Sequence, residues 1–215
     1  MRIQPGRLFT ALLATLLFVG AGTPAHPQTP TPAAGEALFD GKTLTNWQPS
    51  KFYGQGTVAI EDGAIILGSG KDLTGVTWSG PALPTTNYEL TLQARRLEGR
   101  DFFAGITFPV GDSFCSLILG GWGGSIVGLS SINGIDASEN STSQSIEFEP
   151  QRWYSVRIRV TPAKIETWLD GKQIVDQELK GNPVAVRLEV EPSQPLGVAS
   201  WRTKSAVREI RLRKL

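Results

Sequence analysis

The sequence predicts an all-β fold, an antiparallel two-sheet sandwich over residues 36–215. Two observations support this prediction: apolar and polar residues alternate in several runs, and Asp-Gly pairs separate such runs. After the N-terminal region, no window longer than two helical turns shows a 3.6-residue period. We expect about twelve strands in one domain, and the absence of a fixed internal repeat favours a sandwich over a propeller.

The alternation is clearest in three runs. In Tyr88–Arg95 the apolar residues take every second position, so one face of the strand packs and the other is polar. The same pattern recurs in Tyr154–Val160 and in Val184–Val190. The side chains that we expect to be buried are Tyr88, Leu90, Leu92, Val156, Ile158 and Val186.

Two Asp-Gly pairs predict hairpins. Asp62-Gly63 and Asp170-Gly171 each lie between two runs of strand-forming residues. A two-residue hairpin turn requires positive φ angles, which Asp and Gly adopt readily. We therefore expect the runs on either side of each pair to be neighbours in a sheet.

Composition excludes several classes of function. The chain has 21 Lys and Arg against 20 Asp and Glu, a formal charge of +1, so on the average it has no basic footprint for nucleic acid. The single cysteine, Cys115, excludes an intrachain disulfide framework and a thiolate zinc site, and we expect it to be a buried, inert thiol. The single histidine, His26, lies near the N-terminus, so the folded body has no imidazole for a Ser-His-Asp or Cys-His nucleophile. Catalysis would have to use carboxylates, Lys, Arg, Tyr or a metal held by oxygens.

Residues 1–25 are expected to be a signal peptide. Arg2 and Arg7 make a positive start, and the apolar stretch at residues 8–19 is shorter than the roughly 20 residues of a transmembrane helix. Residues 26–35, rich in Pro, Thr and Ala, are interpreted as a spacer that cannot form a core. We expect an exported protein, periplasmic or extracellular, with no stable membrane insertion after processing. An uncleaved N-terminal anchor is the alternative.

A glycine-rich segment around one tryptophan, Gly120–Gly124, is the first candidate binding element. Glycine allows a sharp bend or the close approach of a ligand, and Gly121 and Gly123 flank Trp122. One interpretation is a bulged strand with Trp122 packed as a lid on the core. The other places Trp122 at the rim of a groove, where its indole face would stack on a pyranose ring.

A second candidate is the loop that contains Asp136, Glu139 and Asn140. Its carboxylate and amide oxygens could hold a divalent cation such as Ca²⁺ or bind sugar hydroxyls, although the spacing is not that of an EF-hand. The alternative is a solvated turn in which Asp and Asn cap backbone groups.

Polar residues of the alternating runs form a third set of candidates. Arg95, Arg157, Arg159, Arg187 and Glu189 could line a functional polar sheet face. More often such residues are only the solvated side of an antiparallel sheet.

Several motifs follow one another in a specific order. The most specific is the opening Leu-Phe-Asp-Gly-Lys-Thr-Leu-Thr-Asn-Trp at residues 38–47. The others lie at residues 60–65, 88–90, 153–158, 168–172, 195–201 and 207–212. In this order the chain resembles the 3-keto-disaccharide hydrolase family over residues 36–215. The resemblance implies a jelly-roll sandwich of the concanavalin A-like kind, related to laminin-G-like modules and laminarinases.

Two runs depart from the family pattern. Residues 103–109 read Phe-Ala-Gly-Ile-Thr-Phe-Pro where the family usually has a polar Asn and Arg. Residues 113–120 hold no carboxylate where the family carries Glu and Asp, and the E-x-D-x-x-E strand of laminarinase-type glycosidases is absent as well.

The resemblance implies acid and base chemistry on a 3-keto glycoside or disaccharide, in which the carbonyl at C3 acidifies the proton at C2. The candidate catalytic carboxylates are Asp136, Glu139 and Glu189, with Arg95 or Arg187 polarising the keto oxygen. The candidate substrate-binding residues are Trp122, Asn140, Arg95, Arg187, Gly121 and Gly123. The expected partner is a carbohydrate or glycoside and not nucleic acid.

Three hypotheses about function remain open at this point. The chain is an exported hydrolase or lyase, a non-catalytic carbohydrate-binding sandwich, or a laminin-G-like interaction module. A groove with paired acids would favour the first, an aromatic groove without acids the second, and a flat face the third. The identity of the sugar, any metal and the oligomeric state are left open.

Overall fold

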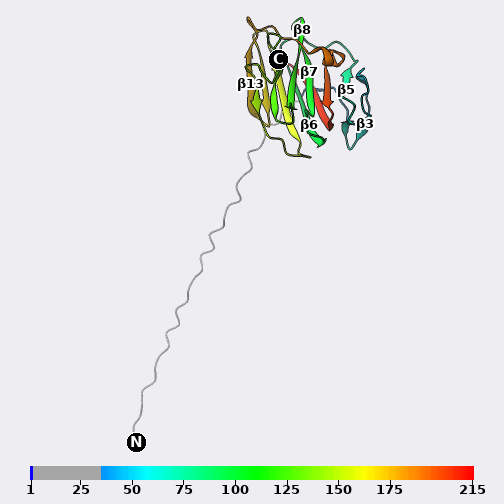
Figure 1. Ribbon diagram of the computed structural model, residues 1–215, viewed down its shortest axis with the longest axis vertical. Coiled ribbons are helices and arrows are strands. Elements are labelled where there is room, and N and C mark those ends of the chain that lie inside the picture. Colours follow the sequence, from blue (N-terminus) through cyan, green and yellow to red (C-terminus); the bar gives the residue numbers. More distant parts are fainter. Residues whose placement is uncertain (2–34) are drawn as a thin grey trace.

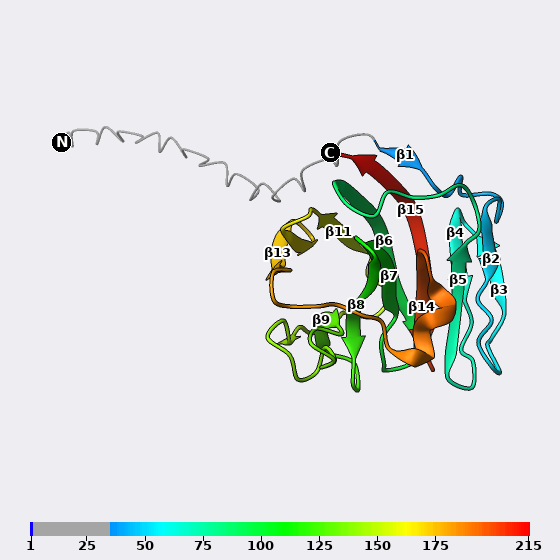
Figure 2. The ribbon, with the colours of Figure 1, turned by 90° about the horizontal axis from the view of Figure 1, so that it is seen from above.

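The computed structural model describes Met1 and residues 35–215 and shows two antiparallel β-sheets packed face to face (Figures 1 and 2). The prediction of an all-β, two-sheet sandwich is confirmed. The predicted signal peptide and spacer, residues 1–25 and 26–35, lie outside the described residues except for Met1 and Gly35. Within the described part of the chain, no helix is long and apolar enough to cross a membrane.

Sheet A contains eight strands in the order β13-β12-β11-β6-β15-β4-β3, with β1 paired to β15. Its strands are β1 (Glu36–Ala37), β3 (Val58–Glu61), β4 (Ala64–Leu67), β6 (Tyr88–Glu98), β11 (Tyr154–Val160), β12 (Lys164–Leu169), β13 (Lys172–Glu178) and β15 (Lys204–Lys214).

Sheet B contains seven strands in the order β10-β9-β8-β7-β14-β5-β2. Its strands are β2 (Trp47–Pro49), β5 (Leu73–Trp78), β7 (Ala104–Val110), β8 (Ser113–Gly121), β9 (Ile126–Ser130), β10 (Gln144–Ser145) and β14 (Gly197–Trp201).

Both predicted hairpins are confirmed. Asp62 and Gly63 have φ angles of 48° and 76° and connect β3 to β4, while Asp170 and Gly171, at 49° and 81°, connect β12 to β13. These are the positive φ angles that a tight turn between twisted strands requires.

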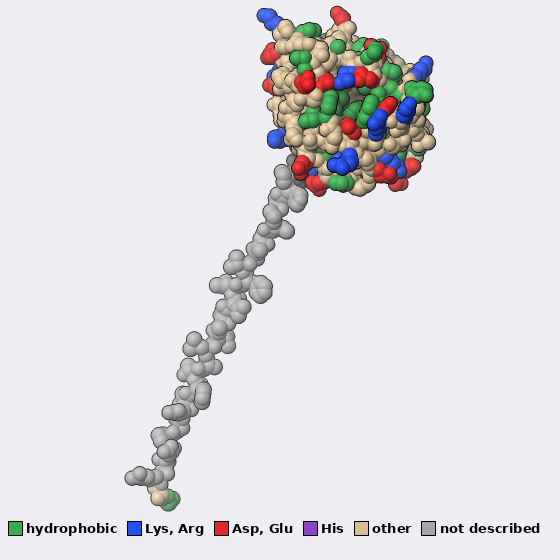
Figure 3. Space-filling model, in the orientation of Figure 1, with side chains coloured by type: hydrophobic (Ala, Val, Ile, Leu, Met, Phe, Trp, Pro, Cys, Tyr) green, Lys and Arg blue, Asp and Glu red, His purple; other side chains and the backbone are tan. Residues whose placement is uncertain are grey.

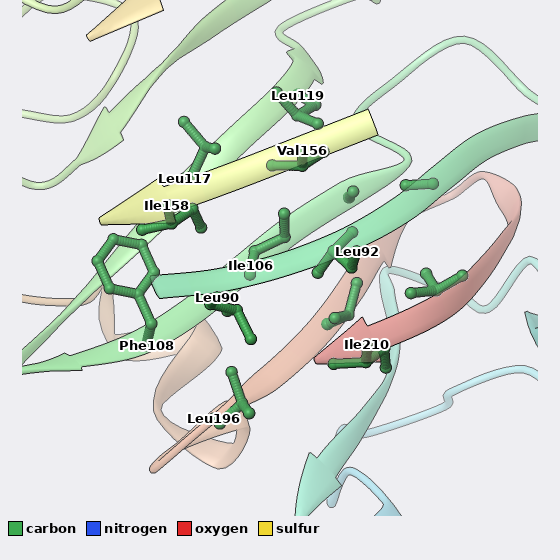
Figure 4. Close-up of a cluster of buried hydrophobic side chains, with 14 of the residues drawn as sticks. Leu90, Leu92, Ile106, Phe108, Leu117, Leu119, Val156, Ile158, Leu196 and Ile210 are labelled. Atoms are coloured by element: carbon green, nitrogen blue, oxygen red, sulfur yellow. The ribbon is translucent and has the colours of Figure 1, made fainter. Parts of the chain in front are cut away.

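The core lies between the two sheets and is filled by alternate residues of both (Figure 4). β8 contributes Leu117, for example, and β7 contributes Ile106. Burying a Leu or Ile side chain contributes roughly 1.5–3 kcal/mol, so this layer is the main source of stability. Five predicted core residues are buried: Tyr88, Leu90, Leu92, Val156 and Ile158. Cys115 is buried as predicted, and burial raises the pKa of its thiol to about 12.

The prediction of a strand at Val184–Val190 is wrong. Residues 180–196, which we call the strap, form no paired strand and contain only a 3-10 helix, η1 (Leu188–Ser193). Pro183 and Pro192 lie on either side of the predicted strand, and because proline has no N–H to donate, neither end of this segment extends into a longer strand in a sheet. Val186, predicted to be buried, is only half-buried. Since η1 has six residues, no helix in the described residues exceeds two turns, as predicted.

The strap crosses the outer face of sheet B on its way from β13 to β14 (Figure 2). At one end the backbone N–H of Ser131 donates to the carbonyl of Ala185 at 2.6 Å. At the other end Thr77 Oγ1, on β5, donates to the carbonyl of Pro192 at 2.7 Å. The strap thus lies on the face of a sheet, although its alternating pattern is that of a strand within one.

Candidate functional site

A pocket of about 210 Å³ opens on the outer face of sheet B. Its lining combines strands of this sheet, the strap, and the turns at the ends of β6, β8 and β14. Figure 3 shows hydrophobic side chains near the middle of this face, between acidic and basic side chains. The face is therefore hollowed and mixed in character rather than flat and uniformly polar.

Serines form part of the pocket floor. Ser116 on β8 lies opposite Ser130 on β9, and both line the pocket. Their neighbours Leu117 and Leu129 are fully buried in the core, so by alternation the serines face outward. Ser116 Oγ also lies 2.8 Å from Thr107 Oγ1 of β7, which fixes its position. The floor thus offers hydroxyl groups beside the apolar surface of the walls.

Trp122 stands at the rim of the pocket because β8 bulges at its end. The pairing register shifts between Leu119 and Gly121, and Gly120 and Trp122 have φ angles of 74° and 48°. Arg96 Nη2 donates to the carbonyl of Gly124 at 2.9 Å and thereby stabilises the turn. Trp122 is 44% exposed, so the turn is a bulge, as one interpretation expects, but its indole is not packed on the core as a lid.

Two further aromatic residues and a carboxylate complete this wall. Phe102 and Trp201 line the pocket with ring centroids 6.4 Å apart, and the backbone N–H of Trp201 donates to the carbonyl of Phe102. Asp101 accepts hydrogen bonds from the backbone N–H of Phe102 at 2.7 Å and of Gly123 at 3.3 Å. Asp101 therefore links the turn that carries Trp122 to the segment that carries Phe102.

Arg187 and Glu189, both on the strap, form the opposite wall. Arg187 Nη1 donates to Asp136 Oδ2 and its Nη2 donates to Glu189 Oε1, each at 2.7 Å. The hydrogen bond from Arg187 lowers the pKa of Glu189, although partial burial opposes this shift. Glu189 is therefore ionised at neutral pH, the protonation state that a general base requires, although the lowered pKa makes it a weaker base. Three residues predicted from the sequence, Asp136, Arg187 and Glu189, are brought together here.

Other predicted site residues lie elsewhere or have structural roles. Glu139 is exposed, and its backbone N–H donates to the carbonyl of Asp136 at 3.2 Å. Asn140 holds its loop together, since its Nδ2 donates to the carbonyls of Leu129 and Ile135. Arg95 lies on sheet A, with its guanidinium 4.5 Å from the ring centroid of Trp153, and does not meet the other candidates.

The glycines on either side of Trp122 shape the turn. Gly121 is buried at the end of β8, and the N–H of Gly123 is the donor to Asp101. In the described residues, no three His, Cys, Asp or Glu side chains gather as a metal site would require. Asp136 is bound to Arg187, and Asn140 Oδ1 accepts from the backbone N–H of Thr142 at 2.9 Å, so these two side chains already have partners.

Part of the pocket has no direct signal in the sequence. Asp101 and Phe102 follow a turn that carries no recognisable motif, and Trp201 is recognisable only as the end of a family motif. Alternation of β8 could have assigned Ser116 and Ile118 to the outer face. It could not have shown that the strap covers part of this face and leaves a pocket beside it.

The fold and the pocket define a class of protein: a two-sheet jelly-roll sandwich with a partly aromatic, partly charged pocket on the outer face of one sheet. The model of the 3-keto-alpha-glucoside-1,2-lyase-like domain matches residues 35–213, so the chain belongs to this family. The expected family is thereby confirmed. Comparison with curated protein sequences finds no match.

Solved structures with a similar fold have names that refer to carbohydrates. The Crh5 transglycosylase in complex with NAG has a TM-score of 0.60 and 11% identity, over 85% of this chain and 84% of that chain. The carbohydrate-binding module CBM66 from Bacillus subtilis has a TM-score of 0.52 and 12% identity, over 79% of this chain and 96% of that chain. A putative glycosyl hydrolase from Parabacteroides distasonis has a TM-score of 0.53 and 14% identity, over 83% and 92%. At these identities the likeness shows the fold alone.

Proposed function

We propose that the chain binds one sugar ring of a glycoside in the pocket and cleaves the 3-keto form of that glycoside as a 1,2-lyase. The observation that carries the proposal is that the indole of Trp122 and the ionised carboxylate of Glu189 line one pocket. An aromatic face and a few convergent polar groups are what a small-molecule site requires. Membership of the lyase-like family supports the reaction class, and the names of the similar structures support a sugar ligand.

The size of the pocket fits one ring. Pockets for drug-sized ligands have volumes of roughly 300–1,000 Å³. At about 210 Å³, this pocket is smaller, so it would hold one ring while the rest of the glycoside remains outside. The indole of Trp122 would cover the C–H face of that ring.

The reaction would start with transfer of the C2 proton of the 3-keto sugar to Glu189. The electron pair of the C2–H bond moves toward the C3 carbonyl and gives an enolate, whose oxygen the cation of Arg187 stabilises. The pair then returns to form a C1–C2 double bond while the C1–O bond breaks. The leaving oxygen takes a proton from water, and Glu189 returns its proton to solvent. Addition of water to the double bond would complete a hydrolysis.

A second candidate function is carbohydrate binding without catalysis. The observation in its favour is that both carboxylates lining the pocket act as hydrogen-bond acceptors, Asp101 toward backbone N–H groups and Glu189 toward Arg187. A leaving oxygen would therefore find no carboxylic acid in place to protonate it. This candidate needs only the aromatic wall and the hydroxyl floor.

The two candidates are separated by one assay on the parent and the Glu189→Gln variant. Methyl α-glucoside and its 3-keto derivative are offered with and without Ca²⁺, and both binding and release of methanol are measured. Loss of a positioned base lowers turnover by about 10²–10⁴-fold. For a lyase we expect this loss with binding within twofold of the parent. The matched control is Glu191→Gln, which removes an exposed carboxylate from the same 3-10 helix.

Three other outcomes have distinct meanings. Binding without methanol release by the parent would favour the non-catalytic candidate. Equal turnover by the parent and Glu189→Gln would exclude Glu189 as the base. Absence of both binding and turnover would overturn the carbohydrate proposal as a whole.

A further inference from the structure

The outer face of sheet A, on the side opposite the pocket, carries four arginines in a regular grid. Arg157 and Arg159 lie on β11, and Arg211 and Arg213 lie on β15. The central strand β6 runs between them. Because Leu90 and Leu92 of β6 are buried in the core, the alternate residues Glu89 and Thr91 face outward. Alternate residues of one strand are about 6.8 Å apart, and strands two places apart are separated by about 9.6 Å.

One row of this grid is occupied by a carboxylate. Glu89 of β6 lies between Arg159 and Arg213 and accepts hydrogen bonds from both. Arg159 Nε and Nη2 approach Glu89 Oε1 at 3.0 and 2.8 Å. The carboxylate of Glu89 is only 6% exposed, whereas the two arginines are 33% and 37% exposed. The charge that this row presents to solvent is therefore that of its guanidinium groups.

The neighbouring row also has one arginine on β11 and one on β15, but its residue on β6 has no carboxylate. Thr91 of β6 lies between Arg157 and Arg211, in the position that corresponds to Glu89. Arg157 lies 3.7 Å from the ring centroid of Trp168, and its Nη1 also reaches Glu89 Oε1 of the first row at 3.4 Å. Arg211 Nη1 donates to the carbonyl of Gly35 at 3.1 Å. A guanidinium has five N–H donors, so each of these two arginines retains donors for a further acceptor.

We infer that an acidic polysaccharide binds this face and places a uronate carboxylate above Thr91, between Arg157 and Arg211. The bound carboxylate would lie between two arginines in the same way as the carboxylate of Glu89 lies between Arg159 and Arg213. The remaining N–H groups of both arginines donate to its oxygens, as in other charge-assisted arginine–carboxylate pairs. A sheet face with several cations suits successive charged sugars of one chain.

Other anionic partners fit this face less well. The indoles of Trp153 and Trp168 are covered by guanidinium groups and offer no platform on which nucleic-acid bases could stack. In the described residues, no large hydrophobic side chain of a sheet A strand is exposed for insertion into a bilayer. The spacer at residues 26–35 contains no Asp or Glu, so it supplies no carboxylate for the site.

This inference concerns a surface separate from the pocket and does not depend on the proposed lyase activity. The two outer faces lie on opposite sides of the sandwich, so one polysaccharide could be held on sheet A while a glycoside occupies sheet B (Figure 2). The overall charge of +1 does not indicate such a site, because the charge is gathered locally.

The test is binding of polygalacturonate to the full-length protein by calorimetry at low and physiological salt. Thr91→Glu places the carboxylate of the protein itself in the open row, so we expect binding at least tenfold weaker. Thr91→Gln, which has a similar size and no charge, is the matched control and should stay within threefold of the parent. Arg157→Gln/Arg211→Gln should also bind at least tenfold more weakly, since each charge-assisted contact contributes about threefold or more.

Removal of two charges elsewhere controls for a general charge effect. Lys51→Gln/Lys71→Gln changes exposed lysines outside sheet A and should bind within twofold of the parent. Melting temperatures verify that each variant is folded. The inference is overturned if Thr91→Glu binds like the parent, if both charge-removing double variants lose affinity equally, or if duplex DNA or anionic vesicles bind as tightly as polygalacturonate.

Discussion

Trp122 is the single residue on which sugar binding depends most in this proposal. The bulge at the end of β8 exposes its indole, and nothing in the core requires an aromatic side chain there. The sequence could not choose between a lid and a stacking surface, because both interpretations follow from glycines around a tryptophan. In the structure, the positive φ angle of Trp122 and the hydrogen bond from Arg96 to the turn leave the indole exposed.

Replacing Trp122 by Ala is expected to weaken binding of methyl α-glucoside by about 1 kcal/mol or more, because aromatic contacts contribute about that much beyond burial of area. Calorimetry measures the change. Tyr53→Ala is the control, since Tyr53 is exposed and lies outside the pocket lining. Equal affinity of Trp122→Ala and the parent would place the sugar elsewhere.

The acid limb of activity is expected to follow Glu189. The hydrogen bond from Arg187 lowers the pKa of Glu189 below its ordinary value of 4.5. A carboxylate with a lowered pKa loses its charge only as the pH falls through the lowered value. Glu189 would therefore remain an ionised base at a lower pH than an unpaired Glu. Arg187→Gln should raise the pKa of Glu189 and shift the acid limb of turnover upward.

Carbon-13 NMR titration of the Glu189 carboxyl checks this shift directly. Arg152→Gln serves as the control, because Arg152 pairs with Asp170 on sheet A and not with the strap. An unchanged pKa of Glu189 in Arg187→Gln would show that Arg187 does not set it.

Among the structural elements, the strap and the outer face of sheet A decide how the two faces of the sandwich differ. The strap covers part of sheet B and turns a sheet face into a pocket. On sheet A, arginines take several outward positions of β11 and β15 and stay partly exposed. Alternation predicts the outward positions in both sheets, but it does not predict which face a distant loop covers.

Glu89 is expected to be the main electrostatic anchor of sheet A. Replacing it by Gln leaves Arg157, Arg159 and Arg213 without their shared carboxylate, which should lower the free energy of unfolding by about 2–3 kcal/mol. Urea denaturation at neutral pH measures this change. Glu209→Gln is the control, because Glu209 is exposed and lies 3.9 Å from Arg208.

The same residue gives the stability a pH dependence. Burial raises the pKa of Glu89, but hydrogen bonds from Arg213 and Arg159 outweigh burial, so the pKa lies below its ordinary value of 4.5. A group with a lowered folded-state pKa stabilises fully above its unfolded value, and its contribution disappears as the pH falls through the folded value. The difference between parent and Glu89→Gln should therefore shrink below about pH 4.5. A difference that is constant down to pH 3 would contradict this account.

At the scale of the whole molecule, the near-neutral charge of the chain conceals an uneven distribution. The arginine grid lies on sheet A, while the aromatic pocket with Asp101 and Glu189 lies on sheet B. Stacked sheets are separated by about 10 Å, so the two faces are independent surfaces. A sandwich of this kind can combine two binding functions without one disturbing the other.

Export is the prediction that belongs to the whole chain. We expect cleavage after a signal peptide, with the mature N-terminus between Gly22 and His26, because Arg2 and Arg7 precede a short apolar stretch. Intact-mass analysis of protein recovered outside the cytoplasm tests this. A mass that includes Met1 would contradict cleavage.

Local sequence patterns were enough to predict the all-β class, both hairpins and most of the core, because period-two alternation and Asp-Gly turns are local signals with local causes. It failed at Val184–Val190, where the alternation fits a strand but the segment lies across a sheet. Tertiary structure alone decided that Arg187 joins Asp136 to Glu189, that Asp101 and Phe102 stand beside Trp122, and that Thr91 leaves a gap between two arginines. Apart from Arg187 and Glu189, these partners are far apart along the chain, and only the pairing of distant strands and the path of the strap set the distances between them.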